Sequence, residues 1–336
     1  MRVLVCGGAG YIGSNMTAML IAEGHETVVF DNLSKGHKSA IGKIEFVEGD
    51  PVPLLVQGDL TDNRLLVETL EKYGIEAVMH FAAFIEVGES IQCPLRYYRN
   101  NFCCTENLLS AMETVGVEKF VFSSTAAVYG IPEEIPIKED SPTKPINPYG
   151  QTKLAVEWMC HDQSQSGKLA YASLRYFNAC GAGNNSTLGE DHRPESHLIP
   201  LTIQAAMGKR GEIKIYGTDY DTPDGTCIRD YIHIDDLCRA HLLALDWLDR
   251  GRELICNLGN EKGHSVREVI ETVKKVSGKE FKVTEVNRRP GDPPRLTADA
   301  TKARKELGWK IEKPDLEEMV STAWQWHSNN PNGYPD

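Results

Sequence analysis

Residues 7–13 read GGAGYIG and place three glycines at intervals of three residues. The stretch follows residues 2–6, RVLVC, whose run of β-branched and apolar residues predicts a buried strand. It opens residues 12–24, in which apolar side chains recur at the spacing of a helix. Glycines between a strand and a helix allow a tight turn and a close backbone approach to a diphosphate. The stretch therefore predicts a dinucleotide site, and a glycine turn without a ligand is the alternative.

An acidic residue at the end of the second predicted strand narrows the choice of dinucleotide. Asp31 ends the strand at 26–32 and lies eighteen residues after Gly13. A carboxylate at this place can bind a ribose 2′-hydroxyl and would repel a 2′-phosphate. The residue therefore favours NAD over NADP, although the positive charges of Lys35 and Lys38 weaken the inference.

Predicted strands alternate with predicted helices up to about residue 178. This alternation indicates βαβ units with right-handed crossovers. The expected fold class is therefore α/β, a Rossmann-type doubly wound parallel sheet with a smaller C-terminal α/β substrate domain. The predicted strands are residues 2–8, 26–32, 44–50, 53–59, 76–83, 118–124 and 171–178. The predicted helices are residues 12–24, 63–74 and 95–116 and one that begins near Tyr149.

The pattern changes after residue 178. Residues 179–196 are polar and contain glycine, which predicts a loop, and shorter mixed elements follow. We expect an NAD-binding domain at 1–177, to which the chain returns at about 228–248, and a substrate domain that is mainly 178–336. The shorter predicted elements are strands at 213–217 and 254–260 and helices near 235–248, 265–276 and 316–327.

Charge and composition exclude several classes of partner. The formal net charge is −12, which argues against nucleic acid or an anionic membrane, since both attract basic surfaces. No stretch approaches the ~18 apolar residues of a membrane span, and the N-terminal apolar run is too short for a signal-peptide core. The nine cysteines contain no C-x-x-C pair, so we expect free buried thiols, no metal site and a cytoplasmic location.

A tyrosine and a lysine stand four residues apart in NPYGQTK, residues 147–153. Tyr149 and Lys153 would share one helix face. They are either a catalytic pair or two solvated residues on the surface of the helix. Nearby positive charge from the lysine and from an oxidised nicotinamide would favour the phenolate, making the tyrosine a general base. Thr125 ends the stretch SST after a predicted strand and can bind or relay the substrate proton. The preceding dinucleotide pattern favours the catalytic interpretation.

Several motifs together resemble the extended short-chain dehydrogenases/reductases and, more narrowly, the UDP-glucose 4-epimerase family. They are GGAGYIG, DNLS, HFAA, VGES, SSTAAVYG, PYGQTK, LRYFN, GTCIRDYIHIDD, RRPGDPPRLTAD, ELGW and the final NPNGYPD. The resemblance covers essentially the whole chain. It implies catalytic roles for Thr125, Tyr149 and Lys153, with tightly bound NAD as the cofactor.

The resemblance also implies the binding residues. The expected cofactor contacts are Gly7, Gly10, Tyr11, Ile12, Gly13, Asp31, Asn32, Asp59, Leu60, Phe81, Ala82, Ala83, Asn100, Tyr149, Lys153 and Phe177. The expected contacts to a UDP-sugar are Thr125, Tyr149, Asn178, His197, Leu198, Tyr216, Arg229, Arg289, Asp292 and Leu296. Asp59 is preferred to Asp50 on the adenine side because its interval to HFAA, residues 80–83, matches the family. Residues 51–59 then look like an insertion.

Three positions depart from the family pattern. Ile85 stands where many members have a lysine near the cofactor diphosphate, and His197 stands where others have asparagine. Leu296 occupies the position of the family's size gate, where a tyrosine goes with plain hexoses and a small residue also admits N-acetylhexosamines. Leucine is intermediate, so the size of the accepted sugar stays open.

The implied activity is the interconversion of UDP-galactose and UDP-glucose. Tyr149, helped by Thr125, would take the proton of the fourth hydroxyl while hydride passes to NAD and returns to the opposite face of the sugar. Epimerisation of a UDP-N-acetylhexosamine or a UDP-pentose is one alternative, and a non-catalytic NAD or nucleotide-sugar binding protein is another. Alanines at 126 and 127 argue against a 4,6-dehydratase, which usually has an Asp-Glu pair there. The resemblance also implies a homodimer built on a helical face, with 96–115 and the helix from Tyr149 as candidates.

Overall fold

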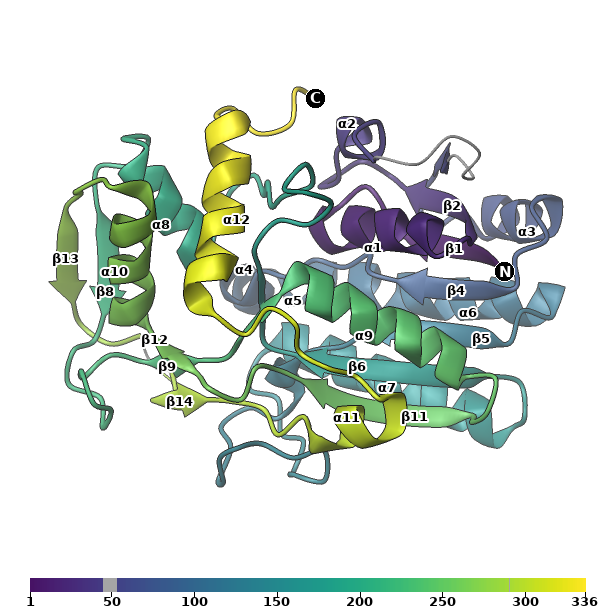
Figure 1. Ribbon diagram of the computed structural model, residues 1–336. Coiled ribbons are helices and arrows are strands. Elements are labelled where there is room, and N and C mark those ends of the chain that lie inside the picture. The colour runs from purple at the N-terminus through teal and green to yellow at the C-terminus, as the bar shows by residue number, and fades with distance from the viewer. Residues whose placement is uncertain (45–52, 290) are drawn as a thin grey trace.

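A seven-stranded sheet lies at the centre of the computed structural model, which describes residues 1–44, 53–289 and 291–336 (Figure 1). The strand order is β3-β2-β1-β4-β5-β6-β11, and every neighbouring pair is parallel. The strands are β1 (Arg2–Cys6), β2 (Glu26–Asp31), β3 (Leu54–Gln57), β4 (Ala77–His80), β5 (Lys119–Ser123), β6 (Ala170–Tyr176) and β11 (Glu253–Leu258). The order reverses between β1 and β4, so the predicted doubly wound sheet is confirmed.

Helices cover both faces of this sheet because the side chains of each strand alternate between two apolar cores. In β1, Val3 and Val5 pack into one core and Leu4 and Cys6 into the other. Figure 1 shows α9 and α1 across the near face, with α6 and α7 behind the sheet. The covering helices are α1 (Tyr11–Ala22), α9 (Ile234–Trp247) and α11 (Thr301–Leu307) on the first face, and α3 (Asn63–Lys72), α6 (Cys104–Val115) and α7 (Pro148–Gln165) on the second.

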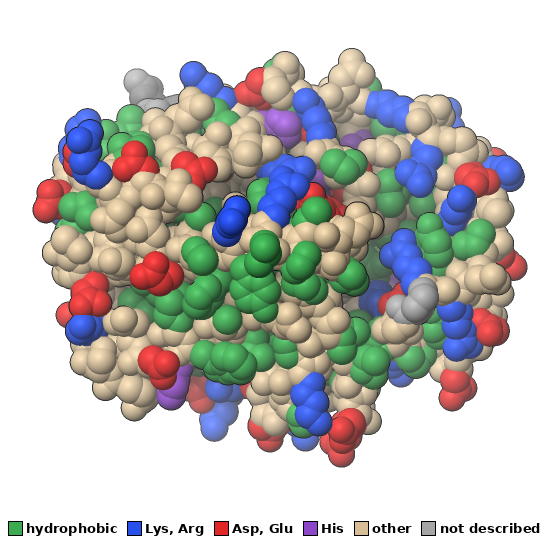
Figure 2. Space-filling model, turned by 180° about the vertical axis from the view of Figure 1, so that it is seen from behind, with side chains coloured by type: hydrophobic (Ala, Val, Ile, Leu, Met, Phe, Trp, Pro, Cys, Tyr) green, Lys and Arg blue, Asp and Glu red, His purple; other side chains and the backbone are tan. Residues whose placement is uncertain are grey.

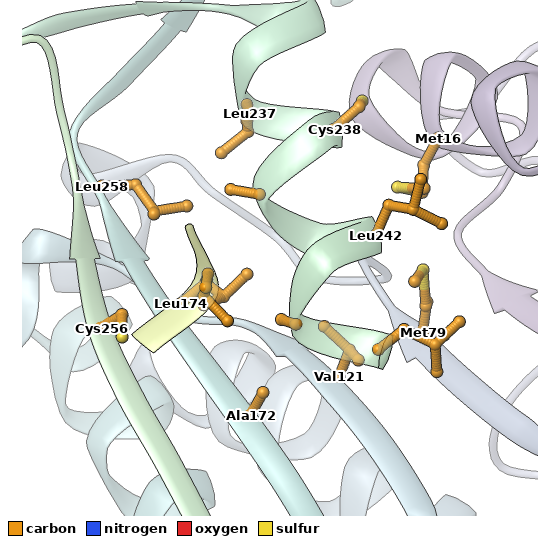
Figure 3. Close-up of a cluster of buried hydrophobic side chains, with 14 of the residues drawn as sticks. Met16, Met79, Val121, Ala172, Leu174, Leu237, Cys238, Leu242, Cys256 and Leu258 are labelled. Carbon is orange, nitrogen blue, oxygen red and sulfur yellow. The ribbon is translucent and has the colours of Figure 1, made fainter. Parts of the chain in front are cut away.

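The near core shows how a late part of the chain joins the sheet. Leu237 and Leu242 of α9 belong to the same apolar core as Val121 and Leu174 of the strands, and Leu242 lies beside Met16 of α1 (Figure 3). The strand β11 that follows α9 pairs with β6 and extends the sheet by one strand. Helix α9 therefore covers the large sheet and β11 extends it, although both follow elements that lie outside the sheet.

The remaining elements form a smaller layered part beyond one end of the large sheet (Figure 1). Its helices α8 (Leu198–Ala206), α10 (Val266–Ser277) and α12 (Leu316–Asn329) pack on one another and on short strands. The short strands are β7 (Asn178–Cys180), β8 (Ile213–Tyr216), β9 (Ile228–Arg229), β10 (Tyr231–His233), β12 (His264–Ser265), β13 (Val283–Val286) and β14 (Arg295–Leu296). The other short elements are α2 (Lys38–Ile41), α4 (Val87–Gln92), α5 (Pro94–Tyr97), a π-helix (Tyr98–Cys103) and a 3₁₀ turn (Ala126–Val128).

One expectation about local structure is confirmed and another needs correction. Leu54–Gln57, within the strand predicted at 53–59, is the edge strand β3 paired with β2; the interpretation of 51–59 as an insertion relative to the family stays a prediction. Residues 45–50 of the strand predicted at 44–50, and Asp50 with them, lie outside the described residues. The single helix predicted at 95–116 is three elements, because a π-helix interrupts it. Within that turn, the Asn101 amide donates to the Phe84 carbonyl oxygen and accepts from the Phe84 N–H, both at 2.9 Å.

A buried ion pair fixes α7 against β6. The Arg175 guanidinium donates to the Glu157 carboxylate through Nε, at 2.9 Å to Oε1, and through Nη2. Both side chains are almost fully buried, at 5% and 2% exposed. Ser124 also donates to this carboxylate, and Arg175 donates to the Tyr129 hydroxyl at 2.8 Å. The pair therefore joins α7, β6 and the end of β5 at one point.

Glu157→Ala is expected to lower the free energy of unfolding by roughly 3–5 kcal/mol, because it leaves the Arg175 charge buried without a partner. Urea unfolding followed by circular dichroism measures this loss. Glu113→Ala is the matched control, since Glu113 pairs with Lys168 on the surface, and its loss should stay below about 1 kcal/mol. Equal losses in the two variants would contradict a special role for the buried pair.

Candidate active site

A cavity of about 970 Å³ lies at the carboxyl ends of the parallel strands and extends into the smaller part of the molecule. Loops after β1, β2, β4, β5 and β6 form its wall on one side. This is where ligands bind in open parallel sheets, at the point where the strand order reverses. The cavity wall contains every predicted site residue except Leu198 and Tyr216.

The glycine turn forms the part of the wall after β1. Gly7 has a φ of +77°, and a Cβ there would lie 2.6 Å from the backbone nitrogen of Ala82. A Cβ on Gly13 would lie 2.1 Å from the Gly7 carbonyl oxygen. Helix α1 begins after Gly10 without a side-chain cap, so its first N–H groups and its positive dipole end are available to an anion. The turn therefore fits the diphosphate of a dinucleotide.

The acidic residues after β2 and β3 lie together on the same wall. The Asp31 carboxylate accepts the N–H of Ala9 at 3.0 Å and the N–H of Leu33 at 2.8 Å, and its burial raises its pKa. The Asn32 amide donates to Asp59 at 2.7 Å, and this hydrogen bond lowers the pKa of Asp59. The carboxylates keep free acceptor positions, which suit the hydroxyl groups of a ribose. These residues fit the adenosine end of NAD.

Helix α7 positions the tyrosine and the lysine. It begins with Pro148 after Asn147, whose side chain accepts the N–H of Gly150 at 2.9 Å and so caps the helix. One turn further on, Lys153 is 3% exposed and its Nζ donates to the carbonyl oxygen of Ser123 at 2.8 Å. The Tyr149 hydroxyl shares a hydrogen bond with Thr125 at the end of β5. The three predicted catalytic residues therefore meet at the carboxyl end of one strand.

Burial changes the charges that the sequence analysis expected at this point. Burial lowers the pKa of Lys153 to about 7, although the Glu157 carboxylate acts in the opposite direction. Burial raises the pKa of Tyr149, and the hydrogen bond with Thr125 offsets only part of the rise. The protein alone therefore keeps the phenol protonated, contrary to the expectation that Lys153 would favour the phenolate. The further positive charge of an oxidised nicotinamide is the remaining source of a lower pKa.

The far half of the cavity carries the predicted substrate contacts. The Arg229 guanidinium forms an ion pair with Asp292, and Leu296 of β14 pairs with Arg229 of β9. The Asn178 amide donates to the Asp230 carbonyl oxygen at 2.7 Å. These contacts orient a guanidinium and an amide on the cavity wall, where they can meet a second phosphate-bearing ligand.

Two predicted contacts lie away from the cavity wall. Tyr216 is covered by the Arg289 guanidinium, whose carbon lies 4.0 Å from the ring centroid, and so it supports an arginine of the wall. Leu198 is the first residue of α8 and packs on the apolar core of the smaller part. The sequence does not distinguish a side chain that packs on a wall residue from one that lines the cavity itself.

Several residues of the wall were not predicted from the sequence. Ser123 and Tyr176 hydrogen-bond to each other beside Lys153, on neighbouring strands. Glu190 and His192 also line the cavity, from the segment predicted as a plain loop. Burial lowers the pKa of His197, but the Glu190 carboxylate raises it above its usual value overall. The signal available in sequence was the mixture of glutamate and histidine in GEDHRPESH, residues 189–197.

Known proteins share both the sequence and this geometry. Residues 3–259 match the model of the NAD-dependent epimerase/dehydratase family. The chain belongs to this family. A UDP-glucose 4-epimerase of Halalkalibacterium halodurans is 48% identical, over 99% of this chain and 98% of the relative. A crystal structure of a UDP-glucose 4-epimerase, 46% identical, has a TM-score of 0.95 with 100% of both chains covered.

A further solved structure bears on the cofactor. A UDP-glucose 4-epimerase of Bifidobacterium longum in complex with NAD⁺ and UDP is 39% identical, with a TM-score of 0.94 over 99% of this chain and 100% of that one. The resemblance to this family and the prediction of NAD are therefore confirmed. Among the helices that the structure describes, none has the length and apolar character needed to cross a membrane.

Gly7→Ala is expected to weaken NAD binding at least tenfold, because the new Cβ meets backbone atoms and the φ of +77° strains an alanine. The nucleotide released by denaturing the purified protein measures the bound NAD. Gly211→Ala is the control, because a Cβ there meets no atom within 4 Å, and this variant should keep its NAD. Full occupancy in Gly7→Ala would contradict the assignment of the glycine turn.

Proposed function

We propose that the chain interconverts UDP-galactose and UDP-glucose, with Tyr149 as the proton-transfer group at the sugar's fourth hydroxyl. The observation that carries the proposal is the meeting of Tyr149, Thr125 and Lys153 at the end of β5, inside one cavity that runs from the glycine turn to Arg229. When bound, NAD supplies reversible hydride acceptance at the fourth carbon. The same family includes dehydratases, but Ala126 and Ala127 offer no additional acid or base there.

Each residue of the trio has a separate role in this proposal. Tyr149 removes the proton of the fourth hydroxyl and later returns it, and Thr125 holds or relays that proton through its hydrogen bond to the phenol. Lys153 is anchored by the Ser123 carbonyl oxygen, so its Nζ would be held in place to bind the ribose of NAD. The three residues therefore contribute by positioning the reacting groups and by the charges they carry.

The substrate half of the cavity suits the UDP group. Arg229 and Arg289 line the wall, and a guanidinium binds phosphate oxygens through a planar fork of donors. Arg229 already pairs with Asp292, so this guanidinium is oriented before a ligand arrives, and the proposed ribose contact of Asp292 is next to it. Anchoring the UDP group leaves the sugar free to turn between its two faces. Leu296 lines the cavity near the sugar end, where its size limits the group at the second carbon.

We also propose the division of the chain and its setting. Residues 1–177, with the return at about 228–248, hold NAD, and the rest of 178–336 mainly holds the UDP-sugar. All nine cysteines are free thiols, seven of them buried, which supports the cytoplasm as the location. Galactose metabolism is the role that follows from the proposed reaction.

We further propose that two copies associate through α4, α5 and α7. These elements contact one another, and they expose Ile91 by 62%, Leu95 by 70% and Trp158 by 61%. Figure 2 shows hydrophobic side chains gathered on the face opposite the view of Figure 1, where α6 and α7 lie. Large apolar side chains exposed together usually mark an interaction surface. We call this surface the α4–α5–α7 patch.

The purified protein is expected to convert UDP-galactose to UDP-glucose without added NAD. Tyr149→Phe should lower kcat by about 10²- to 10⁴-fold, the range of a lost general acid–base group, while keeping its bound NAD. Coupled detection of UDP-glucose measures the rate, and UDP-N-acetylgalactosamine and UDP-arabinose serve as parallel substrates. Turnover of only a parallel substrate would replace the proposed sugar, and binding without turnover of all three would favour a non-catalytic binder.

Leu95→Asp in the α4–α5–α7 patch is expected to convert a dimer into a monomer, because it places a charge in an apolar contact. Light scattering after size exclusion measures the mass. Ile131→Asp is the matched control, an exposed isoleucine outside the patch, at 58% exposed, and it should leave the mass unchanged. A wild-type protein that is monomeric at micromolar concentration would overturn the proposed association.

A further inference from the structure

Four side chains of one short segment converge at the wall of the cavity, and three of them have no part in the proposed reaction. They are Glu190, His192, Glu195 and His197, and one ligand-type atom from each lies within 4.8 Å of all the others. Nδ1 of His192 lies 3.1 Å from Oε1 of Glu190 and 3.8 Å from Oε1 of Glu195. Nδ1 of His197 lies 3.6 Å from Oε1 of Glu195 and forms an ion pair with Oε1 of Glu190. Two nitrogens and two oxygens therefore face one point.

The carboxylates of this cluster are buried and oriented. The side chain of Glu190 is 5% exposed and that of Glu195 is 4% exposed. The Glu195 carboxylate accepts the N–H groups of Ser196 at 2.7 Å and His197 at 2.8 Å. Both hydrogen bonds reach Oε1, the oxygen that also faces the two imidazoles, and they fix the orientation of this carboxylate. The two acids are therefore fixed before any ion arrives.

The imidazoles provide the second observation. Nδ1 of His192 is buried and makes no hydrogen bond within the described part of the chain, despite its short distance to Glu190. The rings of His192 and His197 lie 5.3 Å apart between centroids at an angle of 63°, so they approach the common point in different planes. A buried imidazole nitrogen that lies beside two carboxylates without hydrogen-bond geometry can coordinate a cation once its proton is released.

We propose that Glu190, His192, Glu195 and His197 bind a divalent transition-metal cation of the Zn²⁺ type. In a tetrahedral zinc site with bonds of about 2.0–2.1 Å, neighbouring ligand atoms lie about 3.3 Å apart. Three of the observed separations, 3.1, 3.6 and 3.8 Å, lie near this value. The fourth contact, between His197 and Glu190, is shorter and has to open when an ion binds. Two imidazole nitrogens favour Zn²⁺ and Co²⁺ over Mg²⁺ and Ca²⁺, which prefer oxygen ligands alone. The site departs from the sequence expectation of no metal.

The position of the cluster gives the cation a structural role. Four protein ligands complete a tetrahedral shell, which is typical of structural sites. The segment also crosses the mouth of the cavity: the Ser196 hydroxyl donates to Glu86 at 2.8 Å, and Lys35 donates to the Arg193 carbonyl oxygen at 3.1 Å. A cation would hold this crossing segment in one conformation, between the cofactor half and the substrate half.

Tag-free protein treated with a chelator and titrated with Co²⁺ tests the proposal, and the readout does not depend on epimerase activity. We expect one Co²⁺ per chain, with the visible absorption of four-coordinate cobalt and without a thiolate-to-cobalt band. Added Zn²⁺ should displace the cobalt, and Mg²⁺ in excess should not. Because this titration uses the wild-type protein, the absence of the four-coordinate band overturns the proposal by itself.

Variants identify the ligands. His192→Ala and Glu195→Gln should each weaken Co²⁺ binding at least about tenfold, while circular dichroism shows a retained fold and the bound NAD is unchanged. His161→Ala is the matched control, because His161 faces only one carboxylate, with Nδ1 3.3 Å from Glu253 at the surface. It should bind Co²⁺ like the wild type. Unchanged affinity in both cluster variants, or an equal loss in His161→Ala, would overturn the assignment.

Discussion

The parallel direction of all seven strands of the large sheet is the constraint on which the site depends. Parallel strands bring all their carboxyl ends to one edge, and the reversal of strand order between β1 and β4 opens a crevice there. The glycine turn, Asp31 and Thr125 follow three different strands and still meet in one cavity. An antiparallel sheet would send half of these residues to the opposite edge. Sheet topology, more than any local motif, assembles the site.

Burial at the end of β5 favours neutral side chains before the cofactor is bound. It lowers the pKa of Lys153 to about 7 and raises the pKa of Tyr149, so both groups move toward the uncharged form. The nearby Glu157 charge is largely balanced by Arg175, with which it forms three hydrogen bonds. A cationic nicotinamide would therefore be the main new charge in this region. The proton removal that we propose for Tyr149 would then depend on the oxidised cofactor, which suits a reaction that needs both together.

Sequence predicted the parts of the site that local constraints determine. The glycine turn requires small residues in a strand–turn–helix context, and Tyr149 and Lys153 share one face of a helix whose start is marked by Asn147 and Pro148. The placement of the loop that carries Glu190 was not predictable in this way. Its position depends on residues about 140 positions away.

Those distant contacts come from the C-terminal segment. The Trp326 indole donates to the Thr187 carbonyl oxygen at 3.2 Å, and the Gly189 N–H donates to the Tyr334 hydroxyl at 3.2 Å. A Cβ on Gly189 would lie 2.2 Å from the Trp326 ring, so only glycine allows this contact. No local pattern shows such pairings. The same limit applies to Tyr216, which is partly exposed and stacks on Arg289 of the wall without lining the cavity itself.

The carboxylate of Asp230 brings together the segments that form the proposed substrate side of the cavity, as the parallel sheet brings together those of the proposed cofactor side. Asp230 is buried and accepts the N–H groups of Asn260 at 2.7 Å, Glu261 at 3.1 Å and Ala298 at 3.0 Å. Its burial raises its pKa to about 6, although the three donors act in the opposite direction. Asp230 directly follows Arg229, and its carbonyl oxygen accepts the Asn178 amide. Asp230 thus joins segments that are distant in the sequence. It also helps to fix the position of the neighbouring Arg229 guanidinium.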